Sequence, residues 1–294
     1  MRLTILAALA VLVLATAPTA LGATTTVRYG PFTVPAASGE VPGTVTSVKI
    51  AVTRPCVACF ITSFRPNLVY PDGSTANVDR GVMLHHAVWS SQFSPDATCS
   101  GTPMGLAGQR FFATGNERTI ISVPSGYGYR VRWYDVWHML VDLMNTAASA
   151  QTVYVAVTFD YRWPWENVRG VTPVWLDIDQ CSDSEYSIPA GFSDTHWDWN
   201  VNVPGNVVAA AGHVHGHGIA VEATTKSHGG ASICRSVATP DPTNVHSILS
   251  MSTCAGDPLA RIERGELVRL HSIYQSSHEA HDVMGIMLLY VHPG

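Results

Sequence analysis

The stretch TVYVAVTFDY, residues 152–161, decides the fold class of this chain. Its apolar side chains at Val153, Val155, Val157 and Phe159 alternate with other residues, and a period of two is typical of a strand with one face in a core. Similar runs, separated by Gly, Pro, Asn and Asp, recur along the chain and predict further strands. These runs are Val45–Val52, Gly81–Ser90, Arg118–Val123, Asn206–Ala211, Ile219–Ala223, Glu266–Ile273 and Val283–Val291.

The pattern predicts an all-β protein in two parts. Only Met139–Met144 is interpreted as a helical turn, and the segment YRWPWENVRGVTP, residues 161–173, separates two β-rich halves. Each half is long enough for one β-sandwich or jelly roll. We therefore expect two tandem jelly-roll domains, residues 23–168 and 169–294.

Residues 1–22 are predicted to be a signal peptide. Arg2 precedes an apolar run, and Ala20-Leu21-Gly22 is a small-residue cleavage site. The apolar run is shorter than the roughly 20 residues that span a bilayer, and no later run is long enough. The sequence thus predicts a secreted protein without a transmembrane segment.

Charge and cysteine content narrow the class of protein. The formal net charge is −5, and Lys49 and Lys226 are the only lysines, so no basic stripe is available for a nucleic acid. Six cysteines in an exported chain favour three disulfides. We predict a Cys234–Cys254 bridge and a structural role for the pair Cys56 and Cys59, which has no second CxxC to complete a zinc site.

The C-terminal half contains candidate metal ligands. His213 and His215 are two residues apart, so on a strand both imidazoles face the same side and can bind one metal. Met284 lies in an apolar run where a methionine ordinarily fills the core. Met287, the competing thioether, should point to the opposite face.

The N-terminal half supplies a second pair, His85 and His86. Neighbours on a regular strand point to opposite faces, so sharing one metal requires a β-bulge; the alternative is one buried and one exposed histidine. His138 and His246 are weaker candidate ligands, and His278-Glu279-Ala280-His281 misses the spacing of a zinc peptidase by one residue.

This set of ligands resembles that of the type II copper, ascorbate-dependent monooxygenases, which hydroxylate peptidylglycine or dopamine. In that family a His-His pair and a distant third histidine hold an electron-transfer copper. A His-x-His pair and a methionine hold an oxygen-activating copper. The order of the motifs is the same here: His85-His86, His213-x-His215 and Met284.

Most of the chain from residue 23 is also similar to the stress up-regulated Nod19 family. The resemblance implies that His85, His86, His213, His215 and Met284 are copper ligands. The matching segments are Pro55-Cys56, Tyr70-Pro71-Asp72-Gly73, Met83-Leu84-His85-His86, Leu143-Met144-Asn145, Gly212-His213-Val214-His215, Met251-Ser252-Thr253-Cys254 and Met284-Gly285-Ile286-Met287.

Two departures from the monooxygenase pattern matter. The stretch aligned with the third histidine, Leu140–Asn145, has no histidine. The arginine and tyrosine that hold the carboxylate in the peptide-hydroxylating enzymes are replaced by Ala211 and Leu288. A buried carboxylate would lack its charged partner, so peptidylglycine is not the expected substrate.

The expected function is that of a secreted copper oxidoreductase acting on a small molecule. We expect one or two copper ions, with His213, His215 and Met284 as the catalytic set and ascorbate as a candidate reductant. A thioether favours Cu(I), while imidazoles suit both oxidation states. The alternative is a non-catalytic copper carrier with an incomplete electron-transfer site, and a third hypothesis is a β-sandwich module that binds no metal.

Overall fold

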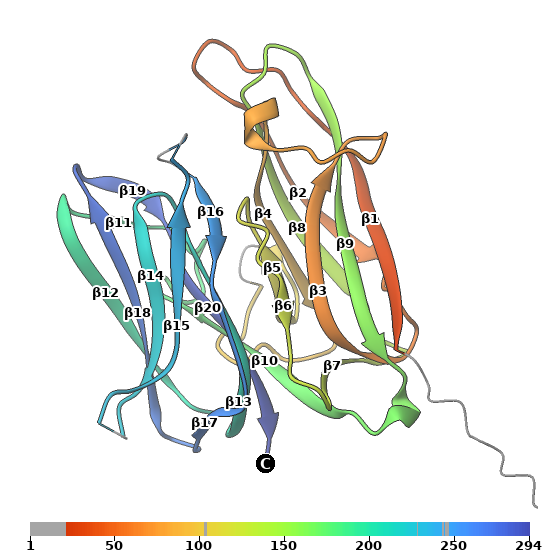
Figure 1. Ribbon diagram of the computed structural model, residues 1–294, viewed down its shortest axis with the longest axis vertical. Coiled ribbons are helices and arrows are strands. Elements are labelled where there is room, and N and C mark those ends of the chain that lie inside the picture. Colours follow the sequence, from red (N-terminus) through yellow and green to blue (C-terminus); the bar gives the residue numbers. More distant parts are fainter. Residues whose placement is uncertain (1–21, 103–104, 228, 243, 245–246) are drawn as a thin grey trace, which may run out of the picture.

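The alternating stretch at residues 152–161 becomes strand β9, which lies between β1 and β3 in a computed structural model of the chain (Figure 1). The structure describes residues 22–102, 105–227, 229–242, 244 and 247–294. The predicted signal peptide, residues 1–22, lies almost entirely outside the described residues. Within the described residues, no helix is long and apolar enough to cross a membrane.

The all-β prediction is confirmed. The largest sheet has the order β1-β9-β3-β7-β10-β20-β13-β17, with β6 beside β3. Its strands are β1 (Ala23–Val34), β9 (Gln151–Arg162), β3 (Cys59–Val69), β7 (Tyr127–Val131), β10 (Arg169–Asp177), β20 (Gly285–Pro293), β13 (Gly205–Val214), β17 (Thr253–Ile262) and β6 (Ile121–Ser122).

Three smaller sheets complete the fold. The first consists of β2 (Gly43–Val52), β8 (Trp137–Asn145), β4 (Val82–Ser91) and β5 (Gln109–Thr114). The second consists of β12 (Gly191–Asn200), β18 (Leu267–Ser276), β14 (Gly218–Thr225), β15 (Ala231–Pro240) and β16 (Ile248–Met251). The third pairs β11 (Tyr186–Ile188) with β19 (Ala280–Val283). The described 3-10 helices are η1 (Val78–Arg80) and η3 (Pro164–Glu166).

Figure 1 shows two sandwich-like bodies side by side, with β5, β6 and β10 between them. We propose the division at residue 168/169, which places β1–β9 in one body and β10–β20 in the other. The bodies share the large sheet, because β10 pairs with β7 over residues 169–171 and with β20 over residues 172–177.

The contact between the two bodies is itself a core. Met284, Ile286 and Leu288 belong to the same buried cluster as the N-terminal sandwich, whereas Met287 belongs to the C-terminal core. The two methionines therefore face opposite sides, as predicted from their odd spacing. Tyr290 adds a hydrogen bond across the contact, donated to the carbonyl of Phe111 over 2.9 Å.

Two local predictions were wrong. Met139–Met144 lies in β8, not in a helical turn, because β8 is paired on both sides, by β2 and β4. Of the strand expected at Arg118–Val123, only Ile121–Ser122 pairs. Arg118 has a φ of 47°, which places it in the left-handed region and in a turn.

The predicted three disulfides are confirmed: Cys56–Cys59, Cys99–Cys181 and Cys234–Cys254. The last joins β15 to β17, which belong to the two facing sheets of the C-terminal body.

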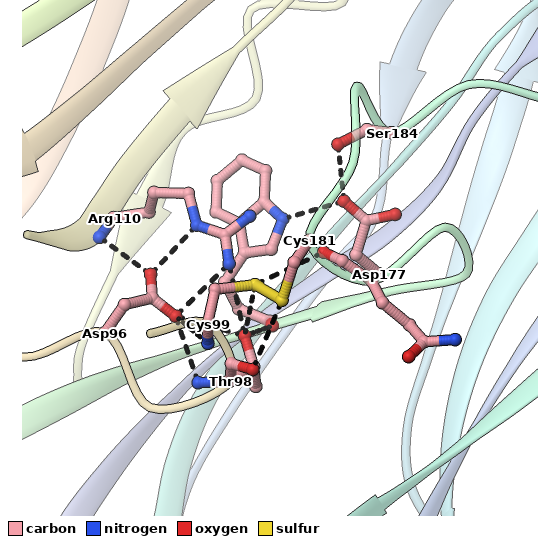
Figure 2. A network of polar contacts seen from close by, with 9 residues as sticks. Asp96, Thr98, Cys99, Arg110, Asp177, Cys181 and Ser184 are labelled. Carbon is pink, nitrogen blue, oxygen red and sulfur yellow. Dashed lines mark hydrogen bonds and ion pairs between the residues drawn. A yellow bond between two sulfur atoms is a disulfide. The ribbon is translucent and has the colours of Figure 1, made fainter. Parts of the chain in front are cut away.

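A buried polar network surrounds the Cys99–Cys181 bridge (Figure 2). Asp96 forms an ion pair with Arg110 in which both side chains are almost fully buried. Thr98 donates a hydrogen bond to the carbonyl of Trp175 over 2.8 Å. The network joins a loop of the N-terminal body to the end of β10, and so fixes the segment that follows β10.

Asp177, the last residue of β10, also holds the segment that follows the strand. Its carboxylate accepts hydrogen bonds from the Trp175 indole over 3.1 Å and from the Ser184 hydroxyl over 2.5 Å (Figure 2). The loop between Asp177 and β11, which carries Asp183, is thereby anchored against the contact between the two bodies.

Candidate metal centre

Four of the predicted ligands meet in one cluster at the contact between the two bodies. His85, His86 and His215 each offer a ring nitrogen within 4.8 Å of the others. The ring of His213 lies beside them, with its centroid 5.3 Å from those of His86 and His215. The two pairs were expected in separate sites, one in each half, but the structure brings them together.

The neighbours His85 and His86 both reach one side of β4 because the strand is irregular there. The register with β8 shifts between Leu84 and His86, which is the β-bulge that sharing a site requires. The centroids of His85 and His86 are 4.0 Å apart. The hypothesis of one buried and one exposed histidine is therefore wrong, since both rings face the cluster.

The pair His213 and His215 needs no such irregularity. His213 lies near the end of β13, paired with Ile286 of β20, and His215 follows directly after the strand. Because residues two apart share a face, both rings point to the cluster. His217, which continues the alternation, lies within a turn closed by a hydrogen bond from the Gly218 N–H to the His215 carbonyl, and has a φ of 69°.

Three of the four imidazoles are fixed through Nδ1. That atom of His85 lies 2.7 Å from the carboxylate of Asp142, and that of His213 lies 2.9 Å from the carboxylate of Glu117. Nδ1 of His215 lies 2.5 Å from the carbonyl of Asp282, to which it donates. Such partners orient metal-binding histidines and leave Nε2 available.

The Nε2 atoms that face the cluster are placed as the ligands of a metal ion would be. Nε2 of His86 and Nε2 of His215 are 3.0 Å apart, and two nitrogens bound at about 2 Å to one ion would lie about 3 Å apart. Nε2 of His213 is buried and has no hydrogen-bond partner among the described residues. A buried polar atom without a partner is costly, and a bound cation would satisfy it.

The protonation states also suit a cation. Burial lowers the pKa of His86 and of His215, and the neighbouring histidines lower both further. Both rings are therefore neutral at neutral pH, the form that binds metals. Burial alone would raise the pKa of Glu117, but the adjacent His213 outweighs burial and lowers it, so Glu117 is an anion.

Gly115 is needed for the approach of Glu117 to His213. A Cβ at residue 115 would lie 2.5 Å from the Glu117 carboxylate and 3.0 Å from the His213 ring. The Gly115 N–H also donates to that carboxylate over 3.1 Å. A larger residue would displace the carboxylate and the imidazole together.

Met284 is buried between β19 and β20 and lines a cavity that His86 and His213 also line. Its position is tied to that of His215 through Tyr274. The Tyr274 hydroxyl accepts from the His215 N–H over 2.9 Å and donates to the Met284 carbonyl over 2.5 Å.

The weaker candidates lie elsewhere. His138 is on β8, four residues from Asp142, and its Nε2 lies 3.2 Å from the Gln92 amide. That spacing corresponds to about 13 Å along a strand, so His138 does not join the cluster. His246 lies outside the described residues. His281, from the near miss to a zinc-peptidase motif, is on strand β19 and not on a helix.

A cavity of about 260 Å³ lies beside the cluster, between the two bodies. His86, His213 and Met284 line one part of it. Most of its remaining wall is apolar and includes Ala211 and Leu288. These are the two positions that the sequence resemblance aligned with the arginine and tyrosine of the peptide-hydroxylating enzymes.

Sequence reasoning missed three residues of this site: Glu117, Asp142 and Tyr274. Asp142 is the one acidic residue inside the run Met139–Met144, and a charge in an apolar strand is a signal that could have been used. Glu117 lies in a loop and Tyr274 in an ordinary strand, and neither position carries a local signal.

Comparison with known protein families places the chain in one of them. Residues 139–293, more than half of the chain, match the family described as Stress up-regulated Nod 19. The chain belongs to this family. The matched region includes Asp142, His213, His215, Tyr274 and Met284.

Two curated fungal relatives are similar to part of the chain. One is the "Probable copper-dependent oxygenase M1" of Phoma sp., 32% identical over 169 residues, which are 56% of this chain and 42% of the relative. The other is the "Probable copper-dependent oxygenase clz3" of Cochliobolus lunatus, 33% identical over 129 residues, which are 42% of this chain and 40% of the relative. The matches thus span less than half the length of these relatives.

Among solved structures, the crystal structure of the STIV MCP aligns over 92% of this chain and 96% of that chain. The TM-score is 0.32 and the identity is 9%. A likeness at this level carries no argument about fold or function.

Proposed function

We propose that this chain is a secreted, copper-dependent oxidoreductase that hydroxylates a C–H bond of a small molecule. One oxygen atom of dioxygen would enter the substrate and the other would leave as water. The two electrons and two protons that this requires would come from an external reductant such as ascorbate. The observation that carries the proposal is the convergence of four histidines from both halves of the chain beside a cavity.

The residues that would hold copper are His85, His86, His213 and His215, with Met284 at the edge of the set. Copper bound there would supply one-electron redox chemistry with dioxygen. Asp142, Glu117 and the carbonyl of Asp282 hold three of the rings in a fixed tautomer, with Nε2 directed to the cluster.

Substrate would lie in the cavity next to His86, His213 and Met284. The apolar wall excludes water from that end of the cavity, which protects a reactive site from side reactions. Neither Ala211 nor Leu288 can pair with a carboxylate, so a peptide C-terminus would find no charged partner there.

Membership of the Nod 19 family and the names of the two fungal relatives support the oxidoreductase proposal from outside the site. The three disulfides support the secreted part of the proposal. The disulfides favour an oxidising compartment such as the cell exterior.

Copper stoichiometry tests the proposal first. We expect the purified chain, reconstituted with Cu(I) under anaerobic, reducing conditions, to retain copper after desalting. His86→Ala and His213→Ala should each reduce the retained copper, and the surface variant His196→Ala should not. If neither cluster variant changed the copper content, the cluster would not be the copper site.

Oxygen uptake then separates catalysis from copper carriage. We expect ascorbate-dependent oxygen uptake that a Met284→Leu variant loses, although Leu keeps the volume and the stability of the site close to those of Met. Bound copper without oxygen uptake would favour a copper carrier. Full uptake by the Met284→Leu variant would exclude Met284 from the reaction.

A further inference from the structure

The wall of the cavity between the two bodies is mostly apolar. Strands β4, β5 and β8 of the N-terminal body contribute Val88, Ala113 and Leu140, and the C-terminal body contributes Trp175 and Leu288. Cavities of this type, mostly apolar with a few polar groups, are characteristic of small-molecule sites.

Apart from His86 and His213, the ionisable side chains that line the cavity, among the described residues, are all acidic. These are Glu117, Asp142, Asp183 and Glu185. Glu117 is paired with His213, and Asp142 with His85 and with the Thr46 hydroxyl. The carboxylates of Glu185 and Asp183 complete the wall where the loop after β10 reaches it.

Glu185 differs from the two paired carboxylates. It is half-buried, and burial raises its pKa, as do the neighbouring carboxylates of Asp282 and Asp183. Its carboxylate oxygens can accept a hydrogen bond from a hydroxyl or an ammonium group. The anchored loop described above holds it at the cavity wall.

We propose that this cavity binds an apolar small molecule whose polar group is uncharged or cationic, a hydroxyl or an amine, and that it rejects molecules with an anionic group. An anion would lose its water among four carboxyl groups, with no lysine or arginine to replace that water. A hydroxyl or an ammonium can bond to Glu185 while its apolar body packs against Trp175 and Leu140.

The identification of this ligand as the substrate rests on the proposed function, but its binding requires no metal. The test is therefore made on the full chain, freed of metal with a chelator. Three probes share one skeleton: 3-phenylpropan-1-ol, 3-phenylpropylamine and 3-phenylpropanoate. Their affinities are measured by titration calorimetry and by ligand-observed NMR.

We expect the alcohol and the amine to bind at least about tenfold more tightly than the carboxylate, a difference of about 1.4 kcal/mol. Glu185→Gln should weaken the amine more than the alcohol, because it removes the negative charge but keeps a hydrogen-bonding group. Binding of the carboxylate as tight as that of the alcohol, or binding of none of the three probes, would overturn the proposal.

A matched pair of variants locates the binding. Ala113→Phe fills the cavity and should abolish binding of the alcohol, whereas Ala231→Phe makes the same change on an exposed position and should leave it intact. Where circular dichroism shows that Ala113→Phe does not fold, Val88→Phe replaces it. Alcohol binding that survives in the folded filling variant would contradict the assignment to this cavity.

The two proposals fail separately. Probe binding in a chain that takes up no copper would leave the cavity proposal standing and contradict the copper function. Copper uptake by a chain that binds none of the probes would leave the copper function standing and contradict the cavity proposal.

Discussion

The two histidine pairs reach the same cluster by opposite means. His213 and His215 use the regular alternation of a strand, whereas His85 and His86 are neighbours and need a bulge in β4. A spacing of two therefore indicates a shared face without further information. A spacing of one indicates it only when the register of the neighbouring strand is known.

The pairs also differ in where their supporting carboxylates come from. His85 is held by Asp142 of its own body, and that side chain is 22% exposed. His213 is held by Glu117 of the other body, and that side chain is 4% exposed. His85 is thus supported within one body, while the support of His213 depends on the contact between the two.

The largest expected effect comes from removing one ligand of each pair. We expect His85→Ala and His215→Ala each to weaken Cu(I) binding by at least about 100-fold, because even partners outside the coordination shell are worth about 10–100-fold. Competition with a chromogenic Cu(I) chelator measures the affinity. If each variant kept one full-affinity copper, the pairs would hold separate ions and the single cluster would be disproved.

A smaller effect separates the two carboxylates. We expect Glu117→Gln and Asp142→Asn each to weaken Cu(I) binding by about 10–100-fold. The loss should be larger for Glu117, because its more buried site leaves the imidazole without a charged partner in a drier environment. The same chelator competition measures both. A larger loss for Asp142→Asn would reverse the inferred roles.

A third comparison concerns one tyrosine in each body. We expect Tyr274→Phe to lower the free energy of unfolding by about 1–3 kcal/mol, because it leaves the buried His215 N–H and Met284 carbonyl without their partner. Tyr29→Phe should cost less, since the hydroxyl of Tyr29 bonds to one backbone group among the described residues, the Thr53 carbonyl, over 3.0 Å. Urea denaturation measures both changes, and equal losses would remove the special role assigned to Tyr274.

The smallest effect is expected from a surface carboxylate of each body. The Arg65 guanidinium lowers the pKa of Asp160, and Arg269 with Lys226 lowers that of Asp198. A folded pKa below the unfolded value of about 3.9 means that the stabilisation is present above that pH. It is then lost as the pH falls through the folded pKa.

Replacement of these carboxylates should therefore lower the free energy of unfolding at neutral pH, and progressively less as the pH falls. We expect Asp160→Asn and Asp198→Asn each to lower the free energy of unfolding at pH 7 by less than about 1 kcal/mol. The loss should be larger for Asp198, which has two cationic partners. Denaturation series between pH 7 and pH 2 measure this, and a loss that grew in acid would contradict the sign.

The strands were largely predictable because their side chains alternate, as in residues 152–161. Met139–Met144 failed because β8 is paired on both sides and packed, so its apolar positions show no clear period. The His-x-His pair was predictable for the same reason as the strands. The bulge at His85 was stated as a requirement, and only the register of β8 against β4 shows that it exists.

The meeting of the two pairs could not be predicted. His86 and His215 are 129 residues apart in sequence, and no local pattern relates positions at that distance. Glu117 was missed for the same reason, because its importance comes from a contact with His213, which lies 96 residues further along the chain. Residues that act across the contact between the bodies are defined by tertiary structure alone.

The large shared sheet has a consequence for how the protein folds. Its two ends are formed by β1, near the start of the chain, and by strands from the last third, and β20 must insert between β10 and β13. Contacts this distant in sequence form slowly, since the entropy of a long loop is lost before they stabilise the chain. The four histidines can therefore come together only when the last strand is in place, so copper uptake during refolding would report the completion of the native topology.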